Sequence, residues 1–459
     1  MQDITIGIIG GGISGIASAK EAIKNGYNVQ LFEKNESIGG VWYSKSYPGC
    51  RIQTSKESYK YSDIEYDEDV PLYPDRDEII SYLEKTINKF NLNDKIYYNC
   101  NVINTEFIKS SNKWKIEYYK NNETTKPITF ICDYLIIATG FYGETPNSQE
   151  IIKNKDLLKH KIFFPGDFSY TGTENINMLK DKSVVIIGNG PTGCDLAAIA
   201  NDHNAKKISV IYRSKRWIFQ RYLWKTLSVH LYFTNRYFFC CIDIIPNKLY
   251  SILLVLYYYV VFLLLHGNFL FFPVPYGKRV NRSNFVLNES FVNLVYNKKI
   301  DYIQTNKVEI DDDFVVTDIK AINYDVCILA TGYKNSINCM KMDNIPLLYK
   351  HIIHPYINNC AFIGFIGTFN CMQAYELQAK WYMKHLNDIS NLSPKNMQNY
   401  IECEYKKKKS KKIDYHDMLF DYVMDYYDDI CKECDITQKY KKYDPRYWLI
   451  PQGPDLLNY

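Results

Sequence analysis

Features that would mark a secreted, metal-bound or nucleic-acid-binding protein are scarce in this sequence. The start, MQDITIGIIGGG, has no basic region or cleavage site of a secretory signal, so a reducing, cytoplasmic setting is expected for the 13 Cys. The 8 His are spread singly, and the one CxxC, Cys431 to Cys434, has no His nearby, so no metal site is predicted. With 55 basic and 51 acidic residues, the net charge of +4 predicts no nucleic-acid partner.

An apolar stretch in the second half of the chain is too short to cross a bilayer. Ile252 to Leu265, ILLVLYYYVVFLLL, holds 14 uncharged residues, whereas a spanning helix needs about 20. Two alternatives stay open: the stretch packs on the protein, or residues 250–272 contact the surface of an intracellular membrane peripherally. Six Lys within 406–412 are expected on a solvated face, with an anionic membrane as the alternative.

The chain does contain one large unit that occurs twice. Its 459 residues and 54.0 kDa are enough for two or three domains. An apolar strand, a Gly-rich turn, a helical segment and a second strand follow one another from Ile4 and again from Ser183. The turns are Gly10-Gly11-Gly12-Ile13-Ser14-Gly15 and Gly188-Asn189-Gly190-Pro191-Thr192-Gly193. Because the middle glycine lets the backbone approach a diphosphate at a helix N-terminus, the pattern predicts dinucleotide binding rather than mere helix packing.

The residues after each second strand indicate which dinucleotide each unit binds. Glu33 stands 18 residues after Gly15, where a carboxylate can bind a ribose and would repel a 2′-phosphate, as suits FAD. In the second unit Arg213 offers a planar cation for the 2′-phosphate of NADPH, the alternative being a solvated surface cation. Two buried-strand patterns, 134–140 and 326–333, contain Ala-Thr-Gly after the apolar run and are predicted to pass close to the dinucleotides.

With these motifs the chain resembles the flavin-containing monooxygenases, class B flavoprotein monooxygenases, over almost its whole length. Further segments carry the resemblance, including some of the plant-type branch: GGVW at 39–42, QTSKE at 53–57, YSD at 61–63, LATGY at 329–333, HPYINNCAFIGF from 354 and ELQAKW from 376. The resemblance implies an α/β fold with two dinucleotide-binding, Rossmann-like domains. Its implied parts are 1–165, the first part of the FAD domain; 166–330, the NADPH domain with a hydrophobic helical insertion at about 218–287; and 331–459, the completion of the FAD domain and a C-terminal strap.

The resemblance also assigns cofactor contacts to particular residues. Those for FAD are Gly10, Gly11, Gly12, Ile13, Ser14, Gly15, Glu33, Gly40, Val41, Trp42, Gln53 and Thr54. Those for NADPH are Gly188, Gly190, Thr192, Gly193, Cys194, Asp195 and Arg213. Gln53 is further expected to act in catalysis by steadying the reacting oxygen or a ribose, whereas without the resemblance it reads as a loop amide that bonds only its own backbone.

The implied activity is an NADPH- and O₂-dependent oxygenation of a small amine or sulfide at its soft nitrogen or sulfur, through a flavin C4a-hydroperoxide. Tyr170 replaces the His of the family's FxGxxxH signature, so a flavin-binding protein that is largely uncoupled or inactive is an alternative. Another is a Baeyer–Villiger enzyme acting on ketones, because Tyr47-Pro48-Gly49-Cys50-Arg51 partly matches YPGxR, although the following Asp is missing. A disulfide reductase is set aside because only Cys50 lies in the flavin region. The sequence predicts no oligomeric state.

Overall fold

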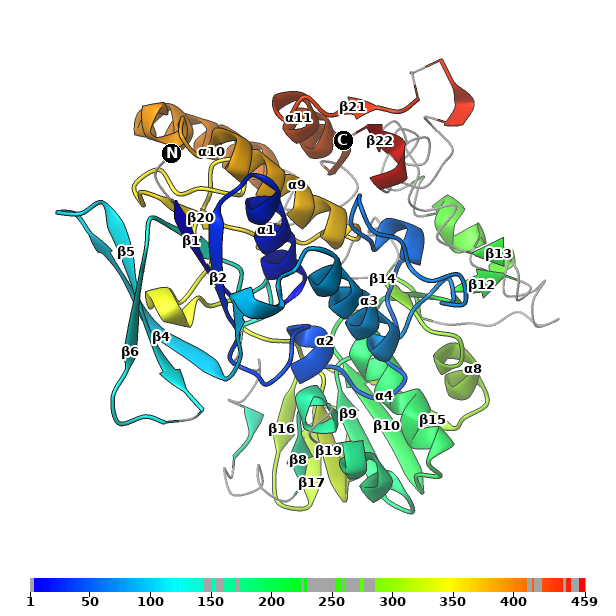
Figure 1. The fold of residues 1–459 in the computed structure, drawn as a ribbon. Coiled ribbons are helices and arrows are strands. Elements are labelled where there is room, and N and C mark those ends of the chain that lie inside the picture. Colours follow the sequence, from blue (N-terminus) through cyan, green and yellow to red (C-terminus); the bar gives the residue numbers. More distant parts are fainter. Residues whose placement is uncertain are drawn as a thin grey trace.

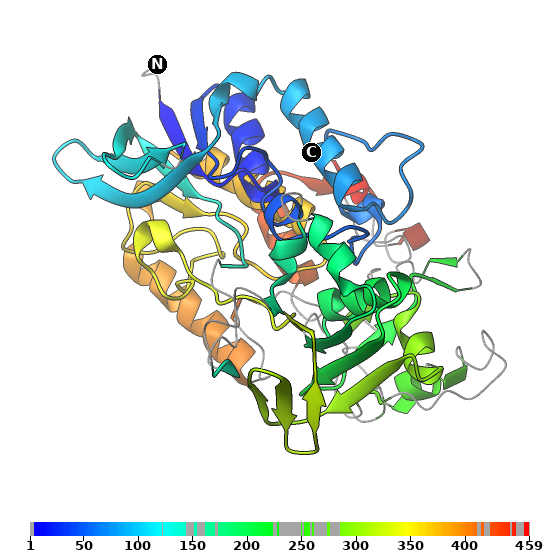
Figure 2. The same ribbon diagram turned by 90° about the horizontal axis from the view of Figure 1, so that it is seen from below.

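The computed structural model folds into two similar α/β units (Figure 1). It describes residues 4–121, 123–143, 151–153, 161–169, 173–223, 227–228, 249, 252–257, 259–260, 273–275, 285–410, 415–416, 423–440, 443–446 and 454–458. Each unit is built on a parallel five-stranded sheet, so the predicted α/β class with two Rossmann-like sheets is confirmed. Figures 1 and 2 both show the blue first sheet and the green second sheet in separate parts of the molecule.

The first unit has the strand order β20-β7-β1-β2-β3. Its strands are β1 (Thr5–Ile9), β2 (Asn28–Phe32), β3 (Ile96–Tyr97), β7 (Tyr134–Ile137) and β20 (Cys360–Phe362). Its helices are α1 (Ile13–Lys24), α2 (Val41–Ser44) and α3 (Arg76–Lys89), and its antiparallel meander consists of β4 (Cys100–Ile108), β5 (Lys113–Lys120) and β6 (Ile128–Cys132). Four of the five β1 residues are buried, because a parallel sheet covered on both faces requires a continuous apolar strand.

The second unit repeats this plan with the order β8-β19-β9-β10-β15. Its strands are β8 (Ile162–Phe163), β9 (Ser183–Ile187), β10 (Lys207–Tyr212), β15 (Ile300–Gln304) and β19 (Val326–Leu329). Its helices are α4 (Pro191–Asp202) and α8 (Phe291–Tyr296), and its meander consists of β16 (Val308–Ile310), β17 (Phe314–Thr317) and β18 (Ala321–Asn323). The fifth strand differs in origin: β20 reaches the first sheet from the C-terminal part of the chain, whereas β8 precedes the second Gly-rich turn.

Strand β8 also bears on the predicted boundary at residue 165. Residues 162–163 pair with β19 of the second sheet, although the sequence grouped them with the first domain. Strand β20 pairs with β7, which places residues after 331 in the first sheet. The sequence shows no sign of β8, because a strand of two residues is too short to show a hydrophobic pattern. The predicted boundary at 165 therefore lies just after this strand rather than before it.

Helix α9 (Cys371–His385) packs along α1, and a buried ion cluster joins them. The Lys20 side chain of α1 is fully buried, and its Nζ donates to Glu21 at 2.7 Å, to Asp63 at 2.9 Å and to Glu376 of α9. Burial alone would lower the pKa of Lys20, but these carboxylates raise it above its usual range. The cluster gives the segments YSD and ELQAKW a structural role, and the lysine already supplies the cation that the three carboxylates need.

The region from 217 onward contains the predicted insertion, most of which lies outside the described residues. Strands β11 (Trp217–Phe219) and β14 (Phe285–Leu287) bracket it and pair in parallel, and β12 (Tyr222–Leu223) pairs with β13 (Leu227–Ser228). Residues 252–257 and 259–260 are helical. Within the described part of the chain, no helix combines the length and apolar character that crossing a membrane requires.

The C-terminal part forms a layer beside the first unit, drawn in orange and red (Figure 1). It consists of α10 (Pro394–Ser410), α11 (Val423–Glu433), β21 (Thr437–Gln438) and β22 (Leu457–Asn458), the two strands being antiparallel. The lysine run at the end of α10 was expected to be solvated, and Lys406, Lys407 and Lys409 are exposed. Lys408 corrects that expectation, because it is fully buried and donates to the Tyr415 carbonyl at 2.6 Å.

Candidate functional site

One cavity of about 800 Å³ is lined by both Gly-rich turns. The first unit contributes Gly10 to Ser14, Glu33, the segment 39–42 and loop residues up to Tyr59. The second contributes Gly190 to Thr192, Asp195 and Arg216, and both Ala-Thr-Gly segments reach the same cavity. The structure thus brings together most of the residues that the sequence predicted for two separate dinucleotides.

Three of the four glycines in the first turn, Gly10, Gly12 and Gly15, occupy their positions for different physical reasons. Gly10 has φ +107°, and a Cβ there would lie 2.5 Å from the Ala138 carbonyl oxygen. A Cβ on Gly15 would lie 1.8 Å from the carbonyl oxygen of Gly10, so α1 can approach β1 only with a glycine there. A Cβ on Gly12 would meet nothing nearer than the Gly40 Cα at 3.6 Å. The fold therefore requires Gly10 and Gly15 but leaves space at Gly12, as a bound diphosphate would need.

The second turn repeats this arrangement. Gly188 has φ +116°, and a Cβ on it would lie 2.4 Å from the Ala330 carbonyl oxygen. A Cβ on Gly193 would lie 2.0 Å from the carbonyl oxygen of Gly188, whereas one on Gly190 would meet no atom within 4 Å. Both Ala-Thr-Gly segments therefore pass directly beside the first glycine of a turn and line the cavity. Their approach to bound dinucleotides stays a prediction.

The helices that follow the turns present their N-termini to the cavity. Gly12 and Gly190 are the N-caps of α1 and α4; among the described residues, no side chain caps either helix and no acidic residue occupies either first turn. Backbone N–H groups and the helix dipole favour an anion at such positions. The geometry therefore fits the diphosphate of one dinucleotide at each helix.

Glu33 directly follows β2 and lines the cavity. It is 3% exposed, its Oε2 accepts from the Gly11 N–H at 2.6 Å, and its Oε1 accepts from the backbone and side-chain nitrogens of Asn35 at 2.9 and 2.7 Å. Burial raises the pKa of the Glu33 carboxyl, which these hydrogen bonds oppose. Asn35, which also lines the cavity, was not predicted because an Asn in a loop gives no distinctive sequence signal.

The segment between Gly40 and Thr54 supplies a further part of the first unit's lining. Val41 and Trp42 lie on α2, and Trp42 Nε1 donates to the Tyr59 hydroxyl at 2.8 Å. Thr54 is 3% exposed, lines the cavity, and its Oγ1 has no hydrogen-bond partner among the described residues. A buried hydroxyl without a partner is costly unless a ligand satisfies it, so Thr54 fits a bound flavin.

Gln53 lies in the cavity wall but its amide is held by the second unit. Its Oε1 accepts from the Leu287 N–H at 2.7 Å, and its Nε2 donates to the Leu287 carbonyl at 3.3 Å. The alternative, a loop amide that bonds only its own backbone, is therefore wrong, because the partner of Gln53 lies 234 residues away. Its catalytic role stays a prediction.

Among the basic residues after β10, Arg216 rather than Arg213 lines the cavity. Arg213 is exposed, and Arg216 Nε donates to the Asn189 side chain of the second turn at 3.0 Å. The sequence passed over Arg216 because it lies four residues beyond the end of β10, whereas the 2′-phosphate cation was expected directly after the strand. The contact of Arg213 with NADPH stays a prediction.

The remaining predicted NADPH contacts on α4 differ in whether they line the cavity. Thr192 lines the cavity, whereas Cys194 is fully buried and does not. Asp195 touches the cavity, but both its oxygens already accept hydrogen bonds, from Tyr47 at 2.9 Å and from Asn288 at 2.6 Å. Burial raises the pKa of Asp195 to about 6. Tyr170 lies outside the described residues.

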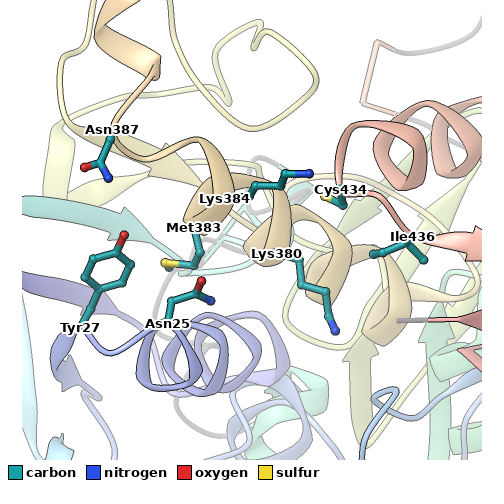
Figure 3. A pocket seen from close by; sticks show the side chains of 8 residues that line it. All are labelled: Asn25, Tyr27, Lys380, Met383, Lys384, Asn387, Cys434 and Ile436. Atoms are coloured by element: carbon teal, nitrogen blue, oxygen red, sulfur yellow. The ribbon is translucent and has the colours of Figure 1, made fainter.

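A second, shallower hollow of about 450 Å³ lies between α1, α9 and the C-terminal layer (Figure 3). Figure 3 shows Lys380 and Lys384 on one helix, with Asn25 below them and Cys434 to the right of Lys384. Lys384 pairs with Asp435, and Lys380 lies 3.8 Å from Glu21. Because acidic side chains lie next to both of its lysines, this hollow suits an anionic dinucleotide less well than the main cavity does.

Comparison with known proteins points to a single family. A family model described as flavin-binding monooxygenase-like matches residues 3–442. Flavin-containing monooxygenase 1 of Homo sapiens is 24% identical over 412 residues, covering 85% of this chain and 75% of that protein. S-allyl-L-cysteine S-oxygenase from Allium sativum has a TM-score of 0.61 at 18% identity, covering 94% of this chain and 88% of that one. An open structure of cyclohexanone monooxygenase has a TM-score of 0.70 at 14% identity, covering 94% and 97%.

Proposed function

Because the chain belongs to the flavin-binding monooxygenase-like family, as its motifs predicted, we propose that it oxygenates a small molecule at a soft sulfur or nitrogen. FAD and NADPH are the cofactors, and O₂ is the oxidant. The observation that carries the proposal is the single cavity into which both glycine turns open. It would place the nicotinamide of one dinucleotide within reach of the flavin of the other.

The first unit would hold FAD and the second NADPH, with the domain limits predicted above except that residues 162–163 pair with the second sheet. Gly12 and the N-terminus of α1 would receive the FAD diphosphate, Glu33 the ribose and Thr54 the flavin. Gly190, Thr192 and Arg216 would receive NADPH. When bound, the reduced flavin supplies the activation of O₂. The protein's own task is to orient the substrate and exclude water, which Phe285, Ile366 and Phe369 in the lining would do.

The charges of the described lining support a neutral substrate. Its acidic residues are Glu33 and Asp195, and protein groups already donate to both. Its basic residues are Lys34, Lys45, Arg51 and Arg216. Anionic dinucleotides suit this balance, but a protonated amine would be desolvated without a dedicated carboxylate. We therefore expect a sulfide to react more readily than an amine.

Baeyer–Villiger oxygenation of ketones is the second candidate, favoured by Arg51 of the Tyr47–Arg51 segment, which lines the cavity. That arginine is partly engaged, since NH1 donates to the Tyr73 carbonyl at 2.9 Å and NH2 lies 3.8 Å from Asp75. An uncoupled flavoprotein is the third, because Tyr170 replaces the family His.

The test offers a dialkyl sulfide, a tertiary amine and a cyclic ketone to FAD-loaded protein with NADPH. Product and H₂O₂ are both counted against NADPH consumed. A sulfoxide, with less N-oxide and no lactone, supports the proposal. Lactone as the main product would establish the ketone reaction instead, and H₂O₂ without any oxygenated product would establish the uncoupled alternative.

A peripheral membrane contact is proposed for the insertion, on a protein that we expect in the cytoplasm. Ile252, Leu253 and Leu256 are 41–56% exposed on one face of the helical residues 252–257, whereas Leu254 behind them is buried, and Leu249 and Val260 are 48% exposed as well. Leu253→Lys/Leu256→Lys should abolish flotation with anionic vesicles. Ile319→Lys, at a 63% exposed site in the second meander, is the control. Unchanged flotation of the double variant would contradict the contact.

A further inference from the structure

The segment Tyr47–Arg51, for which the sequence analysis found only a partial family match, lies between the two units. Tyr47 follows α2 of the first unit and is 2% exposed. Its hydroxyl donates to Asp195 Oδ2 on α4 at 2.9 Å, and it also shares a side-chain hydrogen bond with Thr192. One hydroxyl of the first unit thus contacts the opening turns of the helix that would bind NADPH.

The other oxygen of Asp195 extends this connection through the second unit. Asp195 Oδ1 accepts from Asn288 Nδ2 at 2.6 Å. The Oδ1 of Asn288 in turn accepts from the backbone nitrogens of Ser290 and Phe291 at 3.0 and 2.7 Å, where α8 begins. Asn288 N also donates to the Phe219 carbonyl of β11 at 2.8 Å. Tyr47 is therefore joined through one carboxylate to α4, α8 and β11.

Neighbouring contacts fix the same two segments to each other. Gln53 bonds both backbone groups of Leu287, the residue before Asn288. Arg221 Nε donates to the Ile52 carbonyl at 3.4 Å, and its NH1 pairs with Glu289 at 2.5 Å. The loop 47–53 of the first unit is thus bound to residues 287–289 of the second at several points.

We propose that Tyr47 is a positioning residue that, through Asp195, holds the NADPH-binding end of α4 in place against the FAD-binding loop. This rests on the proposed function, since it needs a dinucleotide on each unit. The bond matters because helix N-terminus and flavin loop belong to different units, and a shift of about 1 Å between reacting groups can reduce a rate about a hundredfold.

The contact should be sensitive to mild acid. Both Asp195 oxygens accept hydrogen bonds. When the carboxyl is protonated, one of these oxygens carries the proton and becomes a donor, so it no longer accepts the hydrogen bond that it accepts as a carboxylate. The titratable or charged groups that face Asp195 are Tyr47 and Cys50 from the first unit, Arg221 before β12, Glu289 before α8 and Cys194 on α4. Burial raises the pKa of Asp195 to about 6, opposed by Arg221 and by the hydrogen bonds from Tyr47 and Asn288.

The experiment measures NADP⁺ affinity by titration of the FAD-loaded protein between about pH 5 and pH 8, with FAD content recorded for each variant. Wild type should bind NADP⁺ more weakly below a midpoint near pH 6. Tyr47→Phe should weaken binding about tenfold at pH 7.5. It should also move the midpoint upward, because the carboxylate loses a donor that favours its charged form. Asp195→Asn can still accept from Asn288 and can donate to Tyr47, so it should bind NADP⁺ without a transition.

Tyr324→Phe is the matched control, because it removes a buried tyrosine hydrogen bond of 2.8 Å within the second unit alone. Wild-type affinity and midpoint in Tyr47→Phe would overturn the proposal. Should that variant lose FAD, Asp195→Asn decides, since a transition near pH 6 that persists in it also overturns the proposal. Wild type that binds NADP⁺ as described but oxygenates nothing would contradict the proposed function alone, whereas wild type that binds no NADP⁺ would contradict both.

Discussion

Gly12 and Gly15 lie in one turn, yet only one of them is required by the fold. We predict that Gly12→Ala folds normally and loses FAD, because its methyl group has space in the protein but enters the predicted diphosphate site. Gly15→Ala should fail to fold, because its Cβ would lie 1.8 Å from a backbone oxygen. Thermal unfolding and the visible flavin spectrum distinguish the two effects. A yellow, fully loaded Gly12→Ala protein would contradict the assignment of FAD to the first unit.

The two arginines after β10 give a second residue-scale prediction. A charged hydrogen bond to the 2′-phosphate contributes about 1.5–3 kcal/mol. Arg213→Ala should therefore raise the KM for NADPH at least tenfold and leave the KM for NADH nearly unchanged. Arg216→Ala, which disturbs the turn through Asn189, should raise both. Equal effects of Arg213→Ala on both cofactors would show that Arg213 has no part in choosing NADPH.

The sequence predicted which residues form each local motif, but it did not predict hydrogen-bond partners far along the chain. The glycine turns, Glu33 and the Ala-Thr-Gly segments follow from local spacing, because each acts on backbone next to it. The partner of Gln53 is 234 residues away and that of Tyr47 is 148 away. A single sequence holds no signal for such pairs, so the assignment of Asp195 as a simple cofactor contact missed its two protein donors.

At the scale of elements, the ion cluster between α1 and α9 should be a main source of stability. Glu376 is fully buried and accepts from Lys20 and from Ser62. Glu376→Gln should lower the free energy of unfolding by about 3 kcal/mol, because it leaves a buried ammonium with one fewer carboxylate. Asp67→Asn, which breaks the exposed pair with Lys85, should change it by less than about 1 kcal/mol. Denaturant unfolding of both variants tests this, and equal losses would contradict it.

A buried histidine under the C-terminal layer predicts an acid limit to stability. His351 is 1% exposed, and neither ring nitrogen has a partner among the described residues. Burial, then Lys408 and His416, lower the pKa of His351 well below its usual range. The folded state therefore excludes a proton that the unfolded chain binds, so stability present above about pH 6.5 falls by about 1.4 kcal/mol per pH unit below it.

His351→Asn should remove this slope, and Asn tolerates the φ of +57° at this position. The measurement is the difference in unfolding free energy between variant and wild type at several pH values from about 4 to 8. A difference that does not change with pH would show that His351 does not titrate with unfolding.

The order of strand, turn, helix and strand in the repeated unit was predictable from the sequence. The edge strand β8 of the second sheet was not. Apolar runs before each glycine turn became inner strands because both faces of a parallel sheet are covered. Strand β8 has only two residues, so the predicted boundary at 165 fell just beyond it. The lysine run at 406–412 read as a solvated face, but Lys408 turns inward because the 415–416 segment packs over the end of α10.

At the scale of the whole molecule, the proposed function depends on two units that share one cavity. Neither glycine turn alone distinguishes an oxygenase from other dinucleotide-binding enzymes. Their meeting in about 800 Å³, with Tyr47 and Gln53 binding one unit to the other, is what makes hydride transfer followed by oxygenation a coherent proposal.

The most direct test follows the oxygen atom. FAD-loaded protein is given NADPH, a dialkyl sulfide and ¹⁸O₂, and the sulfoxide is analysed by mass spectrometry against NADPH consumed. We expect one ¹⁸O atom in each sulfoxide and close to one sulfoxide per NADPH. Sulfoxide without the label, or NADPH oxidation that yields only H₂O₂, would contradict the account.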